Sequence, residues 1–225
     1  MKITFISDTH CKHPEIAPDL PGGDLIIHAG DFTSVGNVFE INQFAMWYNG
    51  LDNYTHKVYI AGNHDLGFEV APDTVHLALQ SYTNITYLQD SLVEIEGVKI
   101  YGSPWTPFFY NWAFNIPRDS DEIASKWNLI PEDADIVITH GPAYGFLDRV
   151  IGESQPLGCE RLTPRLMNVK PKIHVCGHIH SGYGYKQFKG IHFINAAMLD
   201  ESYQYTHKVL HVDWEHKTNL MEFYE

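Results

Sequence analysis

The sequence is poor in cysteine and in basic residues, and it has no long apolar run. Its three cysteines, Cys11, Cys159 and Cys176, are too few and too scattered for a disulfide framework, which favours a reducing, cytoplasmic location. No stretch approaches the roughly 18 consecutive apolar residues of a membrane-spanning helix, and the chain enters a strand-like pattern without an apolar leader. With 15 Lys and Arg against 28 Asp and Glu, the net charge is −13, so we expect no tight binding to nucleic acid or to anionic membranes.

The remaining composition is that of a folded protein. Hydrophobic residues make up 44% of the chain and aromatic residues 13%, which excludes wholesale disorder. Repeats, low-complexity tracts and linker-like segments are missing, so a single domain over residues 1–225 is expected. Histidine is the exception: there are 14, and their positions decide the functional interpretation.

Short apolar runs rich in β-branched residues recur along the chain, and each ends in a polar cluster. Such runs are typical of strands that are buried on both faces. They lie at 3–6, 25–28, 58–60, 136–139 and 173–176. After about residue 182, the segments at 188, 191–194, 209–212 and 220–223 predict antiparallel strands or hairpins.

Apolar residues at helical spacing lie between the strands, at 38–48 and 75–82, with Asp73 or Thr74 as a possible N-cap of the second helix. Residues 159–167 form a third candidate, in which Pro164 must sit in the first turn or kink the helix. Strands that alternate with helices predict an α/β fold, with ligands outside the carboxyl ends of the strands. We therefore expect the five polar clusters at one edge of one sheet.

These clusters supply hard oxygen and imidazole donors without any thiolate, a set that suits manganese, iron or zinc. The candidate donors exceed the needs of one ion and suit two ions about 3.5–4 Å apart, bridged by a carboxylate, for which Asp31 is the best candidate. His64 is placed to contact a phosphate or to protonate a leaving oxygen. The full set is Asp8, His10, Asp31, Asn63, His64, His140, His178 and His180.

Each cluster alone has a simpler explanation. Asp8 and His10 could be a solvated strand end, residues 62–65 a turn rich in Gly and Asn, and the two histidines at 178 and 180 surface residues. Five such clusters at five strand ends, in this order, are hard to explain as coincidences.

As a set, the motifs resemble those of the calcineurin-like metallophosphoesterase superfamily, and within it the small metallophosphoesterase-domain-containing phosphodiesterases. They are Asp8-Thr9-His10, Gly30-Asp31, Gly62-Asn63-His64-Asp65, His140-Gly141 and Gly177-His178-Ile179-His180. The resemblance implies a four-layer αββα sandwich. It also implies a dinuclear-metal-dependent phosphodiesterase in which metal-bound hydroxide attacks small phosphodiesters in line, with 2′,3′- or 3′,5′-cyclic nucleotides the favoured substrates.

The resemblance also implies the role of each motif residue. One metal would be held by Asp8, His10 and His180, the other by Asn63, His140 and His178, with Asp31 as the bridge and His64 as the catalytic histidine. Manganese is the favoured metal, with iron, zinc, nickel and cobalt as alternatives. The oligomeric state is left open.

The substrate contacts rest on aromatic residues near the motifs. Trp105, in an aromatic run at 105–114, could stack on a nucleobase or pack in a satellite core, and Tyr144 or Phe146 could form a lip over the metals. Arg118 could bind a phosphate, although pairing with Asp119 or Asp121 is favoured. Packed or surface positions, rather than metal ligation, are expected for His13, His28, His56, His174, His192, His211 and His216.

Alternatives to the phosphodiesterase remain. A phosphomonoesterase or a DNA nuclease would share the metal chemistry, but the net charge of −13 counts against a nuclease. A low-activity nucleotide-binding or scaffold module should show the loss of a metal ligand or of His64, and the sequence retains all of them.

Overall fold

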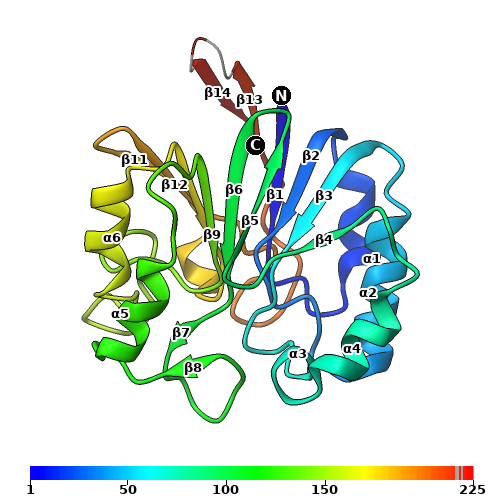
Figure 1. Ribbon diagram of the computed structural model, residues 1–225, viewed down its shortest axis with the longest axis horizontal. Coiled ribbons are helices and arrows are strands. Elements are labelled where there is room, and N and C mark those ends of the chain that lie inside the picture. Colours follow the sequence, from blue (N-terminus) through cyan, green and yellow to red (C-terminus); the bar gives the residue numbers. More distant parts are fainter. Residues whose placement is uncertain (216–217, 219, 225) are drawn as a thin grey trace.

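Two six-stranded sheets pack face to face in the computed structural model, which describes residues 1–215, 218 and 220–224 (Figure 1). The first sheet has the order β14-β13-β1-β2-β3-β4 and the second β11-β12-β10-β9-β6-β5. The strands of the first sheet are β1 (Lys2–Ile6), β2 (Gly23–His28), β3 (Tyr54–Tyr59), β4 (Thr86–Tyr87), β13 (Leu210–Glu215) and β14 (Leu220–Tyr224). Those of the second are β5 (Ser91–Ile95), β6 (Val98–Ser103), β9 (Ile136–Thr139), β10 (Ile173–Cys176), β11 (Gly184–Phe188) and β12 (Ile191–Asn195).

Helices cover the outer face of each sheet (Figure 1). On the first sheet lie α1 (His13–Ile16), α2 (Val38–Asn49), α3 (Gly67–Val70) and α4 (Pro72–Leu79). On the second lie α5 (Asp121–Asn128) and α6 (Leu162–Val169). Shorter elements are the 3-10 turns η1 (Ala17–Asp19) and η2 (His180–Gly182) and the two-stranded pair β7 (Thr106–Pro107) and β8 (Asn115–Ile116).

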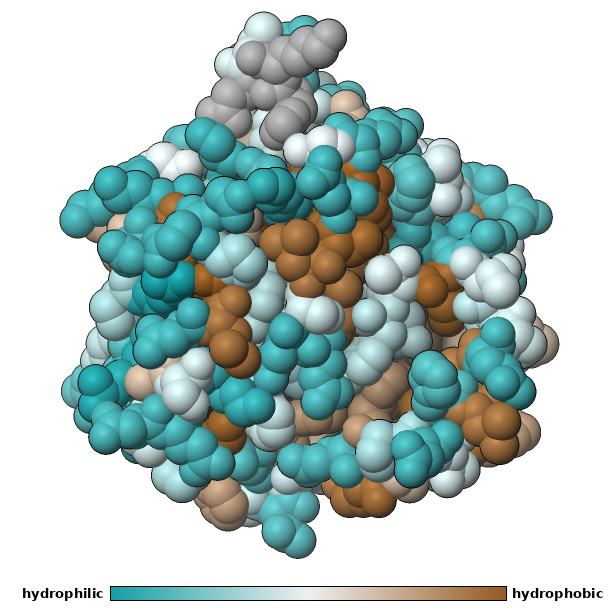
Figure 2. Space-filling view, viewed as in Figure 1, coloured by the Kyte–Doolittle hydropathy of each residue, from teal (hydrophilic) through white to brown (hydrophobic). Residues whose placement is uncertain are grey.

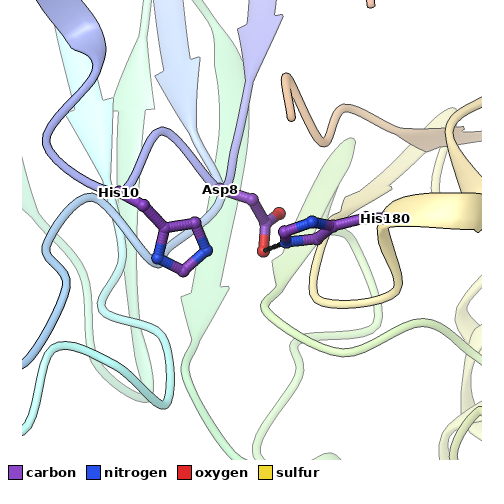
Figure 3. Close-up of side chains that lie close together, drawn as sticks. All are labelled: Asp8, His10 and His180. Atoms are coloured by element: carbon purple, nitrogen blue, oxygen red, sulfur yellow. Dashed lines mark ion pairs between the residues drawn. The ribbon is translucent and has the colours of Figure 1, made fainter. Parts of the chain in front are cut away.

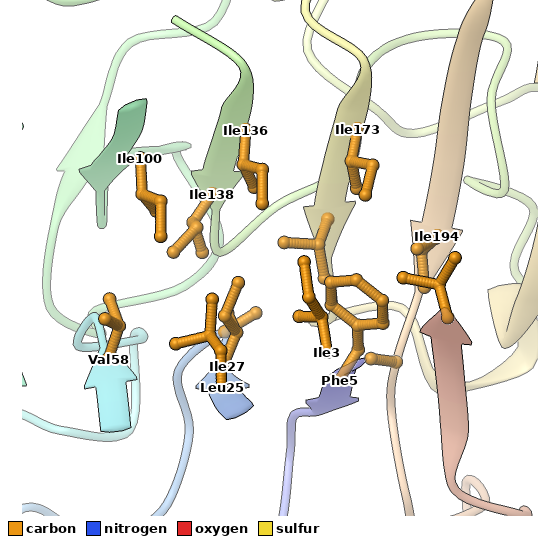
Figure 4. Packing of buried hydrophobic residues seen from close by; sticks show 14 of the residues in the cluster. Ile3, Phe5, Leu25, Ile27, Val58, Ile100, Ile136, Ile138, Ile173 and Ile194 are labelled. Carbon is orange, nitrogen blue, oxygen red and sulfur yellow. The ribbon is translucent and has the colours of Figure 1, made fainter. Parts of the chain in front are cut away.

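Three cores follow from this layering, because strands with two apolar faces bury one against the other sheet and one against helices. Between the sheets, Ile3, Phe5 and Ile27 face Ile138 and Ile173 (Figure 4). A second core lies under α2 and a third under α5 and α6. The four-layer αββα sandwich expected from the sequence is thus confirmed.

The structure corrects the expectation of a single sheet. The strands before the first three polar clusters, β1, β2 and β3, run parallel in the first sheet, whereas β9 and β10 run parallel in the second. The clusters meet because the carboxyl ends of both sets lie on the same side of the sandwich, the lower side of Figure 1. An apolar run shows that a strand is buried on both faces, but not which sheet contains it.

Several boundaries also differ from the sequence-based expectation. Helix α4 begins at Pro72 after Ala71 and ends at Leu79, so Asp73 and Thr74 lie inside its first turn and Tyr82 lies beyond it. A proline at the first helical position costs no hydrogen bond, which explains this start. Pro164 lies in the first turn of α6. Among the late strands, β11 and β12 pair antiparallel with each other, and β13 and β14 pair antiparallel, as expected; β12 also pairs parallel with β10.

The surface agrees with the acidic composition. Figure 2 shows a mostly hydrophilic face with a hydrophobic patch near its centre. Within the described part of the chain, no helix has the length and apolar character needed to cross a membrane.

Candidate dinuclear metal centre

The loops after β1 and β2 turn sharply where the candidate ligands begin. Asp8, His10 and Asp31 all have positive φ angles, of 52°, 37° and 56°, which non-glycine residues rarely adopt. Backbone hydrogen bonds hold both loops together: the Asp8 N–H donates to the carbonyl of Gly30 at 2.9 Å, and the His10 N–H to that of Asp31 at 3.1 Å. Such strain concentrates at functional sites, and here it lets Asp8 and His10 project toward one point.

The first half of the site joins the two sheets. Asp8 and His10 follow β1 of the first sheet, and His180 follows β10 of the second. The Oδ1 atom of Asp8 lies 3.4 Å from Nε2 of His180 (Figure 3). One donor atom from each of the three side chains lies within 4.8 Å of the others, as a shared ion requires.

The second half is built around the side-chain oxygen of Asn63. Its Oδ1 lies 3.0 Å from Nε2 of His140 and 2.7 Å from Nδ1 of His178. Asp31 lies between the halves: its Oδ2 is 3.2 Å from Nε2 of His140 and 3.9 Å from Nε2 of His10. The arrangement brings Asp31 into contact range of both ligand groups.

Backbone carbonyls orient three of the imidazoles. Nδ1 of His10 contacts the carbonyl of Thr33 at 3.1 Å, and Nδ1 of His180 contacts that of Asp200 at 2.8 Å. In His140, Nδ1 contacts the carbonyl of Ala29 at 2.9 Å. Each carbonyl accepts a hydrogen bond from Nδ1–H, so Nε2 of each ring is directed toward the centre of the site, a common support for metal-bound histidine.

Burial and charge shift the pKa values of these groups in opposite directions. Although burial opposes it, His180 holds the pKa of Asp8, and His140 that of Asp31, well below the usual range of a carboxyl. The same pairs, again against burial, raise the pKa values of His140 and His180 to about 9. Burial lowers the pKa of His178 to about 4. The site therefore holds ionised carboxylates in a buried place, where they need compensating positive charge.

The donors fit divalent ions. Nε2 of His10 is buried without any hydrogen-bond partner, although it faces the carboxylate of Asp31 at 3.9 Å. Buried imidazole nitrogens are normally paired, so this atom, beside two buried carboxylates, has the environment of a metal ligand. The mixed nitrogen and oxygen set without a thiolate is compatible with manganese, iron or zinc.

His64 lies at the edge of the ligand set. Its backbone N–H donates to Oδ1 of Asp31 at 2.7 Å, and its Nδ1 contacts the carbonyl of Ser34 at 2.7 Å. Its ring meets that of His10 edge-on, with centroids 4.7 Å apart. His64 also lines a cavity of about 430 Å³ beside the ligands.

Asp65 is a site residue to which the sequence analysis gave no role of its own. It is fully buried, and its carboxylate accepts hydrogen bonds from the backbone N–H groups of Asp31, Thr33 and Gly62 and from the hydroxyl of Thr33. Burial and the nearby Asp31 carboxylate raise the pKa of Asp65 to about 7 against these hydrogen bonds. Asp65 thus ties the loop after β2 to the loop after β3. Its position in the Gly-Asn-His-Asp motif is the sequence feature that could have identified Asp65 as a site residue.

The aromatic residues expected to touch the substrate lie elsewhere. Phe146 is buried and stacks on Phe193 with centroids 4.0 Å apart. Trp105 donates its indole N–H to Asp90 and packs against Phe114. Among the described residues that line the cavity, neither of these two nor Tyr144 occurs.

Other side chains form the cavity wall instead. The apolar side is made by Phe108, Phe109, Val150 and Leu157, while Tyr203 lies near His10 and His180. No sequence signal marked Tyr203 or Leu157, because both come from loops without a motif.

Arg118 lines the cavity but is already paired. Its guanidinium donates to Glu160 at 2.8 Å and to the carbonyls of Leu157 and Gly158. The expected partners were Asp119 or Asp121, and Asp119 instead pairs with Arg161. The predicted pairing of Arg118 with Asp119 or Asp121 is therefore wrong, because Arg118 pairs with Glu160.

The histidines outside the motifs do not join the ligand clusters of the described residues. His28 and His174 are buried and contact the hydroxyls of Thr9 and Thr139. His13 is buried and tilted against Trp47, and His56 approaches Glu96. His192 and His211 stack against aromatic rings. His216 lies outside the described residues.

Comparison with known proteins decides the family. A sequence model of the calcineurin-like phosphoesterases matches residues 1–182. The chain belongs to this family. It is a metal-dependent phosphoric ester hydrolase, and the clusters described above are its candidate metal-binding residues.

Individual proteins also resemble this chain over most of its length. Over 224 residues the chain is 42% identical to metallophosphoesterase domain-containing protein 1 of Homo sapiens, a match that covers 90% of this chain and 68% of that protein. It is 36% identical to UPF0046 protein T07D4.2 of Caenorhabditis elegans, over 90% of this chain and 57% of that protein.

Solved structures share the fold. A protein of Thermus thermophilus gives a TM-score of 0.65 at 13% identity, covering 99% of this chain and 97% of that chain. An archaeal phosphodiesterase gives a TM-score of 0.50 at 16% identity, covering 100% of this chain and 99% of that chain.

Proposed function

We propose that this protein is a two-metal phosphodiesterase that hydrolyses small phosphodiesters, with 2′,3′- or 3′,5′-cyclic nucleotides as the favoured substrates. The observation that carries the proposal is the convergence of seven donor side chains and His64 from five strand ends on one place, where five of the donors and His64 line a single cavity. Asp8, His10 and His180 would hold one ion and Asn63, His140 and His178 the other, with Asp31 between them. When bound, such ions neutralise the phosphoryl oxygens and activate the attacking water.

In this proposal, His64 delivers a proton to the leaving oxygen. The carbonyl of Ser34 accepts a hydrogen bond from Nδ1, so Nε2 is the nitrogen available on the cavity side. A protonated Nε2 can donate to the alkoxide that departs when a ribose ester bond breaks. Asp31 supports this position, because its Oδ1 accepts the backbone N–H of His64.

The size and lining of the cavity suit a substrate with a planar apolar group. Its volume of about 430 Å³ is in the range of small-molecule sites. Phe108 and Phe109 are 62% and 44% exposed, and both line the cavity beside His178. A nucleobase stacked on an aromatic ring gains about 1–3 kcal/mol whatever its identity. We therefore propose that Phe108 and Phe109 make the substrate contacts that were expected of Trp105, Tyr144 and Phe146.

Further properties belong to the same proposal. Manganese is the metal we favour among the ions that are compatible with the mixed oxygen and nitrogen donors. Small molecules rather than nucleic acids or membranes are the proposed partners, on the net charge of −13. A cytoplasmic location and a single domain over residues 1–225 are proposed from the cysteine content and the absence of linker-like sequence.

The test is a substrate panel assayed with Mn²⁺ before and after chelation. It contains 2′,3′-cyclic AMP, 3′,5′-cyclic AMP, bis(p-nitrophenyl) phosphate and the monoester p-nitrophenyl phosphate. We expect metal-dependent turnover of the diesters, and a raised KM for cyclic nucleotides in Phe109→Ala with little change for bis(p-nitrophenyl) phosphate. Preferred turnover of the monoester would indicate a phosphomonoesterase, and two bound metals without turnover would favour the scaffold module.

A further inference from the structure

A rigid aromatic arm, residues 106–116, reaches from the second sheet to the catalytic loop of the first. Its ends are joined by the β7–β8 pair, and the Thr106 N–H donates to the carbonyl of Phe114. Its tip is held by one side chain: Nδ2 of Asn115 donates to the carbonyls of Phe109, Tyr110 and Trp112, and Oδ1 accepts the Phe109 N–H. The arm is therefore fixed independently of any substrate.

The arm contacts the loop that carries Asn63 and His64. The Ala113 N–H donates to the carbonyl of Asn63 at 3.1 Å. Next to it, the indole of Trp112 stacks on the imidazole of His64, with ring centroids 4.0 Å apart and planes inclined by 27°. The function proposed above assigns a role to His64 but none to Trp112.

Three contacts define the orientation of the His64 ring. The carbonyl of Ser34 fixes Nδ1 at 2.7 Å, and the ring of His10 meets it nearly perpendicular at 83°. The third contact is the indole of Trp112, which stacks on the ring and is not among the described residues that line the cavity. The contacts described above connect it to the reaction through His64 and through the loop beneath it.

We propose that Trp112 is a positioning residue that holds His64 in the orientation from which Nε2 delivers a proton to the leaving oxygen. This inference rests on the proposed function, because it needs His64 to be the proton donor. Misplacement of a catalytic group by about 1 Å can cost on the order of 100-fold in rate. The loss should fall on kcat, because Trp112 does not line the cavity.

Two esters separate positioning of a proton donor from general damage to the site. The alkoxide that leaves 2′,3′-cyclic AMP needs a proton, whereas the p-nitrophenolate that leaves bis(p-nitrophenyl) phosphate departs readily without one. We expect Trp112→Leu to lower kcat for 2′,3′-cyclic AMP about 10- to 100-fold, with KM unchanged, and to lower kcat for bis(p-nitrophenyl) phosphate much less. Trp112→Phe keeps a stacking ring and should restore most of the kcat.

A double-mutant cycle with His64→Ala tests whether Trp112 acts through His64. If it does, Trp112→Leu causes no further loss in the His64→Ala background. The matched control is Trp47→Phe, which removes an indole of α2 that does not line the cavity and should leave kcat unchanged. If Trp112→Leu does not fold with its metals, Trp112→Met takes its place in the same cycle.

Three results would overturn the inference: an equal loss on both esters, an effect on KM alone, or an additive loss in the His64→Ala background. Wild-type kcat in Trp112→Leu would overturn it as well. Failure of the proposed function looks different, because the wild-type protein would then turn over neither ester, or His64→Ala would be as active as wild type.

Discussion

At the residue scale, the site depends on buried polar groups whose partners are set by the backbone. His10, His140 and His180 each contact a carbonyl through Nδ1, so Nε2 of each faces the ligand set. The sequence predicted which residues converge, because every candidate ligand follows the end of a predicted strand. It did not predict these tautomers, because the carbonyls that fix them belong to loops distant in sequence.

The role of Asp65 gives a residue-scale prediction. Asp65→Asn replaces a carboxyl group whose oxygens accept these hydrogen bonds with an amide whose NH₂ faces N–H donors in a fully buried place. A buried donor left unpaired costs about 1–3 kcal/mol, so we expect the free energy of unfolding to fall by that amount in urea titrations. The substitution should also lower metal content, because it loosens the loops of Asp31 and Asn63. The exposed Asp52→Asn is the control, and equal stability of the two variants would contradict this role.

The aromatic residues show the limit of prediction from sequence at this scale. Trp105, Phe146 and the cavity-lining Phe109 have similar character and lie near motifs, but only Phe109 lines the cavity. Phe146 is instead covered by Phe193 from another strand. Which aromatic ring is buried depends on long-range packing, and sequence spacing does not encode it.

At the element scale, the site consists of tight loops that follow strands of two sheets. The strands after residue 182 and the helices at α2 and α6 were predicted with modest boundary errors, because their apolar patterns are local. The assignment of the five clusters to one sheet was wrong, because sheet membership depends on pairing across the chain. Strands β5 and β6, which follow one another as a hairpin, were not among the runs identified from the sequence.

The packing of these loops gives an element-scale prediction at Gly62. A Cβ atom at this position would collide with the carboxylate of Asp31 and with the ring of His140. Gly62→Ala should therefore displace the bridge between the ligand groups, lower bound metal measured by mass spectrometry, and reduce kcat about 10-fold or more.

Gly50→Ala is the control for this change. Gly50 ends α2 with an ordinary φ of −82°, and a Cβ atom there would approach Met46 at 3.3 Å. It should keep wild-type metal content and activity. Full metal content in Gly62→Ala would show that the loops after β2 and β3 are not as closely coupled as the structure indicates.

At the scale of the whole molecule, buried neutral histidines make stability depend on pH. Burial lowers the pKa of His28 and of His174 to about 3. An unfolded histidine binds a proton below about pH 6.5, so the unfolded state holds more protons between pH 6.5 and 3, and stability falls as the pH falls through this window. Each such histidine contributes about 1.4 kcal/mol of lost stability per pH unit.

The buried His174 should therefore contribute measurably to the pH dependence of stability, and His174→Gln removes that contribution. The glutamine can keep the contact with Thr139, but it does not titrate. Between pH 6 and 4, the free energy of unfolding of the variant should fall less steeply than that of wild type, by about 1.4 kcal/mol per pH unit. Urea titrations at several pH values measure this difference, and contributions from the metal ligands cancel because both proteins contain them. Substitution of the exposed His76 by Gln is the control, and identical slopes for His174→Gln and wild type would contradict the prediction.

In the proposed function, His64 acts beside a candidate dinuclear site as the proton donor for phosphodiester hydrolysis. The most direct measurement is kcat for 2′,3′-cyclic AMP at saturating Mn²⁺, in wild type and His64→Ala, with metal content determined for both. General acid catalysis contributes about 100- to 10,000-fold, so we predict a loss of that size in His64→Ala with its metal content unchanged. Wild-type turnover in His64→Ala, or no turnover by a wild-type protein that holds two ions, would contradict the account.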